Sequence, residues 1–144
     1  MKQFNKEEQL KFWKANRESF KGDVISNTIL DFSKQYIGKK AIDIGAGSGS
    51  LMLNFKKRFK NKEIIAFDLV PKHPDVKQGD CTDLKLQDNF FDTYFSTDVI
   101  EHLSNEDLGK CLNQANMALK TDGYGIFSTM YNENILASTT TCPE

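Results

Sequence analysis

The sequence of 144 residues lacks several features that would assign it to a specialised class of protein. No apolar run approaches the ~20 residues that a membrane-spanning helix needs. The charged N-terminus lacks the apolar centre of a signal peptide. The three cysteines, Cys81, Cys111 and Cys142, are odd in number and widely spaced, which predicts free thiols rather than a disulfide framework. We therefore expect a cytoplasmic protein without a membrane partner.

The sequence also lacks an excess of charge of either sign. It contains 19 Lys and Arg residues against 20 Asp and Glu residues, and its formal net charge is −1. Such a balance gives no global field that would attract nucleic acid. The length predicts one domain with one hydrophobic core.

What the sequence does contain is an alternation of short apolar segments and helical patterns. The expected strands cover 40–44, 63–69, 76–79, 90–97 and 123–131. The expected helices cover 6–20, the segment between Asp23 and Gly38, 48–59 and 103–119. The apolar face of the second helix is expected to consist of Ile25, Ile29, Leu30 and Phe32. The alternation predicts an α/β fold with a parallel sheet, whose carboxyl edge binds ligands.

Three glycines at alternate positions follow the first strand, in the segment AIDIGAGSGSL at 41–51. Such a turn lets the backbone approach a ligand closely, because no Cβ intervenes. Its spacing is G-x-G-x-G. The dinucleotide fingerprint G-x-G-x-x-G would need a third glycine where this sequence has Ser50. The spacing therefore weakens the dinucleotide hypothesis without excluding it.

Two aspartates follow the next two strands. Asp68 ends the second strand, where a carboxylate can accept hydrogen bonds from both hydroxyls of a ribose. Asp80 ends the third strand, where a carboxylate can accept from the exocyclic amine of adenine. The alternatives are a surface acid at position 68 and a turn or capping acid at position 80. A ribose is common to NAD and S-adenosylmethionine, so Asp80 is the more informative of the two.

Five motifs in order carry a resemblance to a known family: DIGAGSG (43–49), AFD (66–68), QGDCTDL (78–84), FDTYFSTDVIEHL (91–103) and ALKTDGYG (118–125). Together they resemble the class I S-adenosylmethionine-dependent methyltransferases. They are most similar to the small-molecule-type group that has E-H-L after the fourth strand. The resemblance runs from about Lys40 to Met130 and implies a three-layer sandwich with a mostly parallel, Rossmann-like sheet.

The resemblance also implies a cofactor site for S-adenosylmethionine, with S-adenosylhomocysteine as the product. Asp43 and the glycine turn would hold the methionine part, Asp68 the ribose, and Asp80 with the Cys81 amide the adenine. The full implied set is Asp43, Gly45, Ala46, Gly47, Gly49, Asp68, Leu69, Asp80, Cys81, Thr82, Ser96 and Thr97. Phe12 or Trp13 would close over the site, and the alternative for both aromatic residues is ordinary core packing.

Methyl transfer from a sulfonium is an in-line displacement from an already activated donor, so no catalytic residue is obligatory. His102 is the candidate base where the acceptor needs one, and its alternative role is to pack the turn after the fourth strand. Asp98, Glu101 and His102 have the i, i+3, i+4 spacing that gathers side chains on one side of a helical turn. Some methyltransferases hold a divalent ion with a similar acid-x-x-E-H set, so a metal is the alternative here, and our prediction for this site includes none.

Two departures from the family pattern are visible. LVPKHP at 69–74 stands where the family has a helix between strands two and three, and its prolines oppose a helix. Only 14 residues follow Met130, too few for the usual helix and C-terminal hairpin. The fifth strand would then be an exposed edge. We expect a C-terminally shortened chain, or a homodimer that pairs through this strand.

These observations predict one methyltransferase domain over 1–144, with a helical cap at 1–38, a cofactor-binding core at 39–131 and a tail at 132–144. The acceptor is expected to be a small molecule. The basic stretch at 55–62 ends a helix that runs away from the active edge, where cations complement the helix dipole, so a nucleic acid is not favoured. The alternatives are a non-catalytic cofactor-binding or partner module and an NAD(P)-dependent oxidoreductase.

Overall fold

A computed structural model describes residues 5–15 and 22–129 of the chain. The helices are α1 (Lys6–Ala15), α2 (Gly22–Ser33), α3 (Ser50–Arg58) and α4 (Asn105–Ala118), with short 3₁₀ helices η1 (Lys34–Tyr36) and η2 (Ile100–His102). The strands are β1 (Lys40–Ile44), β2 (Glu63–Asp68), β3 (Lys77–Gln78), β4 (Phe91–Thr97) and β5 (Leu119–Ser128). None of the described helices is long and apolar enough to cross a membrane.

The five described strands form one sheet in the order β3-β2-β1-β4-β5. Every neighbouring pair is parallel, and Ile42 of β1 lies opposite Ile65 of β2 and Tyr94 of β4. β1 is therefore central, and the carboxyl ends of all five strands share one edge. The turns after β1, β2, β3 and β4 meet at this edge, as the alternating sequence pattern predicts.

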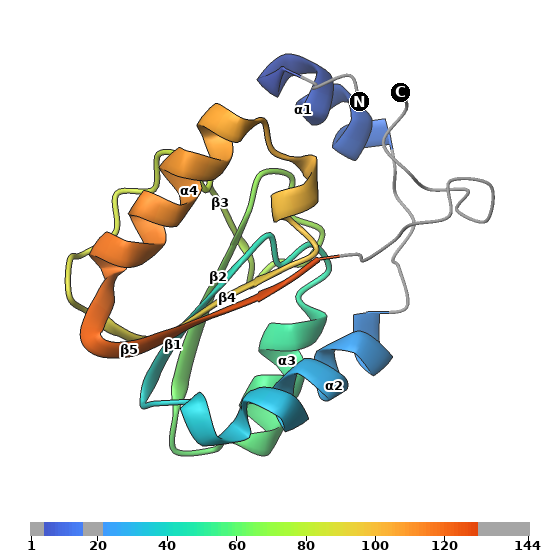
Figure 1. Cartoon of the computed structure of the whole chain (residues 1–144). Coiled ribbons are helices and arrows are strands. Elements are labelled where there is room, and N and C mark those ends of the chain that lie inside the picture. Colours follow the sequence, from blue (N-terminus) through green and yellow to red (C-terminus); the bar gives the residue numbers. More distant parts are fainter. Residues whose placement is uncertain (1–4, 16–21, 130–144) are drawn as a thin grey trace.

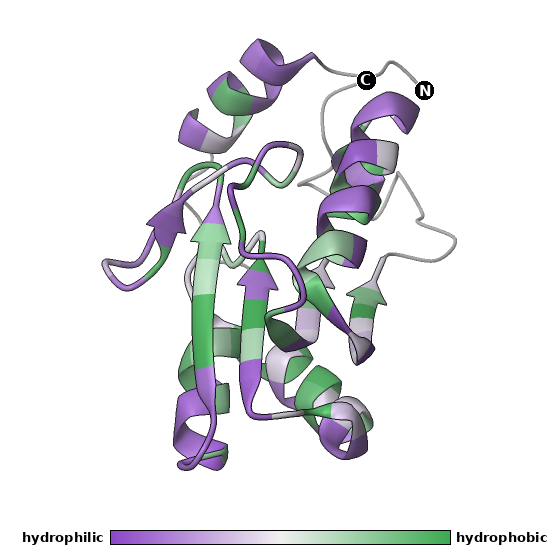
Figure 2. Cartoon of the chain, turned by 90° about the vertical axis from the view of Figure 1, so that its left-hand side faces the viewer, coloured by the Kyte–Doolittle hydropathy of each residue, from purple (hydrophilic) through white to green (hydrophobic). Residues whose placement is uncertain are grey.

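Helices cover both faces of the sheet, which confirms the three-layer α/β arrangement. Figure 1 shows α2 and α3 on one face and α4 on the other. Two hydrophobic clusters fill the spaces between the layers. One is centred on Phe55 of α3 and Phe95 of β4, and the other on Tyr94 of β4 and Ala115 of α4. In Figure 2 the hydrophobic residues concentrate in the middle of the strands, whereas α1 is largely hydrophilic.

The connection between β2 and β3 contains no helix, as its two prolines predict. Residues 69–76 form turns and bends, and a two-residue strand, β3, follows them. Val76 is buried against the α3 side of the sheet, where it belongs to the same cluster as Phe55. The amide of Lys72 donates a hydrogen bond to the carbonyl of Gly47 over 3.0 Å. The short connection thus packs directly against the glycine turn.

The junction between α4 and β5 differs from the prediction. The helix ends at Ala118 and the strand begins at Leu119, so Gly123 lies inside β5 and does not close the helix. Between the pairs Phe91–Leu119 and Thr93–Tyr124 the register advances two residues on β4 and five on β5. The extra residues of β5 at this irregularity stand where the expected turn between helix and strand would lie. The predicted tail at 132–144 and the expected absence of a C-terminal hairpin lie outside the described residues.

The orientation of α2 is also different from the one predicted. Leu30 is buried, but Ile25 and Phe32 are exposed, whereas Ser26 and Ser33 are buried. Ser33 can lie inside because its hydroxyl donates to the carbonyl of Ile29 over 2.6 Å, which satisfies the buried polar group. The expected apolar face of α2 is therefore wrong at positions 25 and 32.

Two phenylalanines test this packing directly. Phe55 is 0% exposed and Phe32 is 74% exposed. Phe55→Ala should lower the free energy of unfolding by about 3–5 kcal/mol, because it removes a buried ring from the core. Phe32→Ala should change it by less than about 0.5 kcal/mol. Urea denaturation of both variants measures the difference, and equal losses would contradict the outward orientation of Phe32.

Candidate functional site

The glycine turn lies between β1 and α3, and backbone hydrogen bonds hold it against β2. The amides of Gly45 and Ala46 donate to the carbonyl of Phe67 over 2.8 and 3.1 Å. The amide of Gly49 donates to the carbonyl of Ala46 over 2.7 Å, and α3 begins at the next residue. Gly45, Gly47 and Gly49 have φ values of +76°, +51° and +77°. These angles favour glycine, because a Cβ makes this region of backbone conformation unfavourable.

The carboxylate of Asp68 connects the glycine turn to the turn after β2. Its Oδ2 accepts a hydrogen bond from the Gly47 amide over 2.8 Å, and its Oδ1 accepts from the Val70 amide over 2.7 Å. The intervening carbonyl of Leu69 accepts from the Gln78 side chain over 3.4 Å. Each carboxylate oxygen has a second lone pair. Asp68 is therefore held in a fixed position with acceptor capacity left for a ligand.

The three glycines are not equivalent in their surroundings. A Cβ at Gly47 would meet no atom within 4 Å, so this backbone is open to a close approach. A Cβ at Gly45 would lie 2.1 Å from Cγ2 of Val99, in the turn after β4. Gly45 is thus needed for packing against Val99, whereas Gly47 leaves space above the turn.

Asp43 is a buried carboxylate at the end of the central strand. It is 0% exposed, and neither of its oxygens has a hydrogen-bond partner. Burial, together with the negative charge of Asp68, raises the pKa of Asp43 to about 7. An unpaired buried carboxylate is costly. Both oxygens of Asp43 can therefore accept a hydrogen bond from a donor, and a cationic donor would be favoured because it also balances the charge.

Asp80 follows β3 and lies in a closed set of hydrogen bonds. Its Oδ1 accepts from the amide and the hydroxyl of Thr82 over 2.9 and 2.7 Å. Its Oδ2 lies 2.7 Å from Nζ of Lys6, which also donates to Oγ1 of Thr82 over 2.8 Å. Burial raises the pKa of Asp80, but the bonds from Lys6 and Thr82 outweigh it and hold the pKa below its usual range.

Cys81 lies half-buried beside Asp80 and is a free cysteine, as is the buried Cys111 of α4. A hydrogen bond with Cys111 raises the pKa of the Cys81 thiol. The thiol of Cys81 therefore stays protonated near neutral pH. Its backbone remains at the position that the resemblance assigns to adenine.

Ser96 and Thr97 form the end of β4, next to the end of β1. Ser96 lies opposite Ile44 in the register, is buried, and its hydroxyl has no hydrogen-bond partner. Asp98 follows with a φ of +54°. Its amide and carboxylate both bond to Ser128 of β5, over 3.1 and 3.0 Å. These contacts fix the backbone turn after β4.

The contacts of Asp98 with Ser128 also affect whether Asp98, Glu101 and His102 can come together. Asp98 is directed to Ser128 by a hydrogen bond from the Ser128 hydroxyl, and Glu101 and His102 lie in η2. Within residues 5–15 and 22–129, no three His, Cys, Asp or Glu side chains are placed to hold a metal ion. The helical spacing of the three residues does not bring them together.

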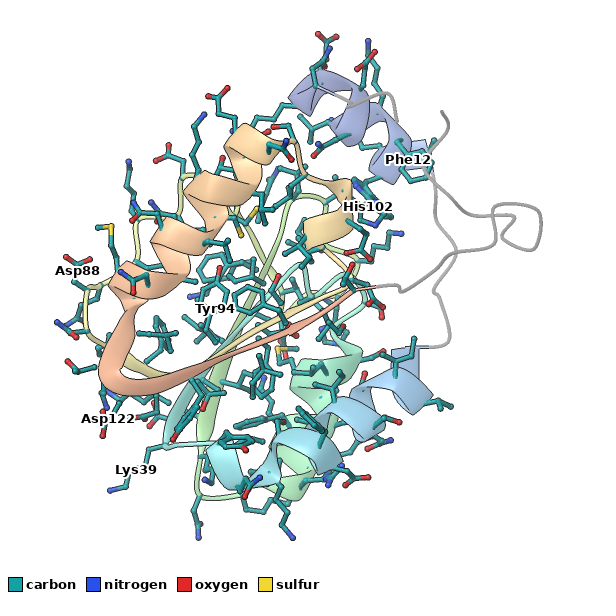
Figure 3. The ribbon with its side chains drawn as sticks, viewed as in Figure 1. Phe12, Lys39, Asp88, Tyr94, His102 and Asp122 are labelled. Atoms are coloured by element: carbon teal, nitrogen blue, oxygen red, sulfur yellow. The ribbon has the colours of Figure 1, made fainter. Side chains whose placement is uncertain are left out.

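Helix α1 crosses this edge and contacts the turn after β4. The ring of Trp13 meets the ring of His102 edge-on, with centroids 5.1 Å apart, and Phe12 packs on Trp13 at 4.9 Å. Figure 3 shows Phe12 and His102 at this end of the molecule. Gln9 is buried and its amide donates to the carbonyl of His102 over 3.0 Å. Neither aromatic residue of α1 belongs to the two core clusters.

The sequence pattern does not reveal Lys6 and Gln9 as site residues. Both lie in a charged helix, and their partners at the sheet edge are 76 and 93 residues away. The only local signal is the position of Lys6 as the first residue of α1, where a cation opposes the helix dipole.

The described edge thus brings together three carboxylates from neighbouring strands and a turn after β4 that contacts Trp13 of α1. Asp43, Asp68 and Asp80 follow the strand order β1, β2 and β3. A family model described as a methyltransferase domain matches residues 42–127, which contain all three. The chain belongs to this methyltransferase domain family.

Individual relatives agree with this assignment. The methyltransferase domain is 28% identical over 99 residues to an uncharacterized RNA methyltransferase, Bd3828, of Bdellovibrio bacteriovorus. It resembles Haemonchus contortus phosphoethanolamine N-methyltransferase 1, solved with phosphoethanolamine and S-adenosylhomocysteine, with a TM-score of 0.66 and 16% identity. It also resembles the PH0226 protein of Pyrococcus horikoshii, with a TM-score of 0.65 and 19% identity. The two structural likenesses show the class I methyltransferase fold.

The methyltransferase domain spans only part of these proteins. The match with the Bdellovibrio protein covers 69% of this chain and 23% of that protein. The corresponding shares are 98% and 37% for the Haemonchus enzyme, and 76% and 58% for the Pyrococcus protein. The chain therefore matches between 23% and 58% of the length of these relatives.

Asp43 supplies a stability test of the methyltransferase domain. A pKa of about 7 in the folded state, above the usual value near 3.8, means that stability is lost as pH rises from about 4 through 7. At pH 8, Asp43→Asn should therefore unfold at higher urea concentration than the natural protein. Three pKa units correspond to about 4 kcal/mol, part of which the unpaired amide offsets, so a gain of about 1–3 kcal/mol is expected.

The comparison needs two pH values. At pH 4 the natural Asp43 is protonated in the folded state, and the advantage of the Asp43→Asn variant should shrink to near zero. Denaturation curves at pH 4 and pH 8 measure both. An equal effect at the two pH values would show that the charge of Asp43 is not the cause.

Proposed function

We propose that this methyltransferase domain binds S-adenosylmethionine and transfers its methyl group to an acceptor by in-line displacement. The observation that carries the proposal is the buried, unpartnered carboxylate of Asp43 beside the glycine turn. An α-ammonium group would satisfy both its charge and its hydrogen bonding. The open backbone at Gly47 gives the space that such a ligand needs.

The residues of the edge fit the rest of the cofactor. Asp68 keeps free lone pairs for the ribose hydroxyls while two amides hold it in place. Asp80 and the Cys81 amide would take the adenine. Thr82 orients Asp80 through two hydrogen bonds. The remaining residues of the proposed cofactor site are Gly45, Ala46, Gly49, Leu69, Ser96 and Thr97.

When bound, the cofactor supplies a methyl group already activated by its sulfonium. The chain itself then has to align the acceptor and exclude water. Without a ligand, helix α1 lies over the acceptor end through Trp13 and Gln9. His102 at this end is the candidate base for an acceptor that carries a proton. These residues give the site its shape, and none of them is required as a nucleophile.

A small molecule is the acceptor class that the charges favour. The basic stretch at 55–62 lies at the far end of α3 and is already used in the fold: Lys56 pairs with Asp75 at 3.4 Å, and Arg58 pairs with Asp31. Lys62 donates to the carbonyl of Ile37. These contacts support a structural role for the stretch. The Bdellovibrio relative named as an RNA methyltransferase makes RNA the second class to test.

The partner that the sheet suggests is a second copy of the chain. Among the described strands β5 pairs only with β4, so none of them covers its second edge, and Tyr124 on β5 is half-exposed. Open edges tend to pair with another strand. We expect a dimer in sedimentation-velocity runs of the whole chain, and Gly125→Pro should shift it toward monomer. Sedimentation of the natural chain as a monomer at micromolar concentration would contradict this pairing.

Asp68 provides the binding test. Asp68→Ala should weaken the affinity for S-adenosylhomocysteine by about 10- to 100-fold in calorimetric titrations, because it removes a charged acceptor and frees the Gly47 amide. Asp75→Ala is the matched control, since Asp75 is an exposed acid in the same β2–β3 connection. Unchanged affinity in Asp68→Ala would contradict the ribose assignment.

The same titrations separate the other functions. Binding of NAD without binding of either adenosyl ligand would indicate an oxidoreductase. Binding of S-adenosylhomocysteine without methylation of any small molecule or RNA would indicate a non-catalytic module.

A further inference from the structure

The carboxylate proposed to hold adenine already has a cationic partner. Nζ of Lys6 lies 2.7 Å from Oδ2 of Asp80 and 2.8 Å from Oγ1 of Thr82. Oδ1 of Asp80 accepts two further bonds from Thr82. Oδ2 is therefore the oxygen with acceptor capacity left for a ligand, and the Lys6 ammonium lies against it.

The ion pair between Lys6 and Asp80 is not needed to start helix α1. Lys6 is the first residue of α1, where its charge opposes the dipole. The helix start is already capped, because the Glu8 amide bonds Oδ1 of Asn5 and the Asn5 amide bonds Oε2 of Glu8. A helix of ten residues is marginal by itself. Its position thus depends on contacts with the sheet edge.

The second end of α1 is fixed at the acceptor side. Gln9 bonds the carbonyl of His102, and Trp13 packs against the His102 ring. α1 therefore links the turn after β3, where Asp80 lies, to η2 after β4. Figure 1 shows the helix beyond the edge of the sheet, next to the start of α4.

We propose that the adenine amine displaces the Lys6 ammonium from Oδ2 of Asp80, so that cofactor binding releases α1 from the acceptor end. The ion pair between Lys6 and Asp80 is called the latch below. The inference rests on the proposed function, because it needs the adenine at Asp80. Order of binding follows from it: the acceptor side opens only after the cofactor is in place. The exchange replaces one donor on Oδ2 by another, without any covalent change.

The electrostatics support a weak, exchangeable latch. The hydrogen bond to Asp80 raises the pKa of Lys6, and Asp80 stays ionised, so both partners are charged near neutral pH. The side chain of Lys6 is half-exposed in this pair. Ion pairs of such exposure contribute little to stability. A neutral amine with additional contacts elsewhere in the site can therefore displace it.

The chain contains a built-in reporter, since Trp13 is its one tryptophan and lies on α1. The experiment compares the whole natural chain with Lys6→Met, which keeps an unbranched side chain one atom shorter and removes its charge. Lys11→Met is the matched control, because Lys11 lies on the same helix, is exposed and, among the described residues, forms its ion pair with Glu7 of the same helix at 2.9 Å. Calorimetry and Trp13 fluorescence are recorded during titration with S-adenosylhomocysteine.

The latch predicts three results. S-Adenosylhomocysteine shifts the Trp13 emission of the natural chain to longer wavelength. Lys6→Met shows part of this shift without ligand. It also binds the ligand about two- to fivefold more tightly, a change of the size that a half-exposed ion pair allows, whereas Lys11→Met binds as the natural chain does.

Two other results would overturn it. Weaker or equal binding by Lys6→Met means that Lys6 does not compete with the ligand. A constant Trp13 emission during binding means that α1 stays in place, and in both cases the proposed function survives. Absence of binding in all three proteins removes the proposed function and the latch together.

Discussion

The buried carboxylate of Asp43 is the constraint around which this edge of the sheet is arranged. It lies at the end of the central strand, flanked by β2 and β4, with no donor for either oxygen. The nearby charge of Asp68 adds to its cost. Two features nonetheless fix it there: the strand pairing, and the glycine turn that begins two residues later. An unfavourable charge in this position lowers stability, and the binding site proposed here would account for it, because functional sites commonly reduce stability.

Most of the fold follows from local sequence patterns. Short apolar segments specify β1, β2 and β4, because strands buried on both faces need continuous apolar runs. The prolines of 69–74 rule out a helix before β3, and the structure has none there. Parallel pairing then brings the acids that end β1, β2 and β3 to one edge. Asp43, Asp68 and Asp80 are consequently neighbours in the fold, although whole secondary-structure elements separate them along the chain.

The features that local patterns miss depend on distant contacts or on ambiguous faces. Helix α2 has apolar residues around most of its circumference, so periodicity alone does not show that Phe32 faces outward. The direct passage from α4 into β5 depends on pairing with β4 and not on any turn signal near Gly123. The contact of Lys6 with Thr82 joins residues 76 positions apart. Charge patterning along α1 gives no indication of which acid Lys6 will meet.

The approach of Val99 to Gly45 links two turns that the chain makes far apart. Val99 Cγ2 occupies the place that a Cβ at position 45 would need. The two positions therefore share a single volume, and a larger side chain at one demands a smaller one at the other. Substitutions at 45 and 99 should be non-additive. In a designed variant of this fold, the glycine turn and the turn after β4 would have to be redesigned as one unit.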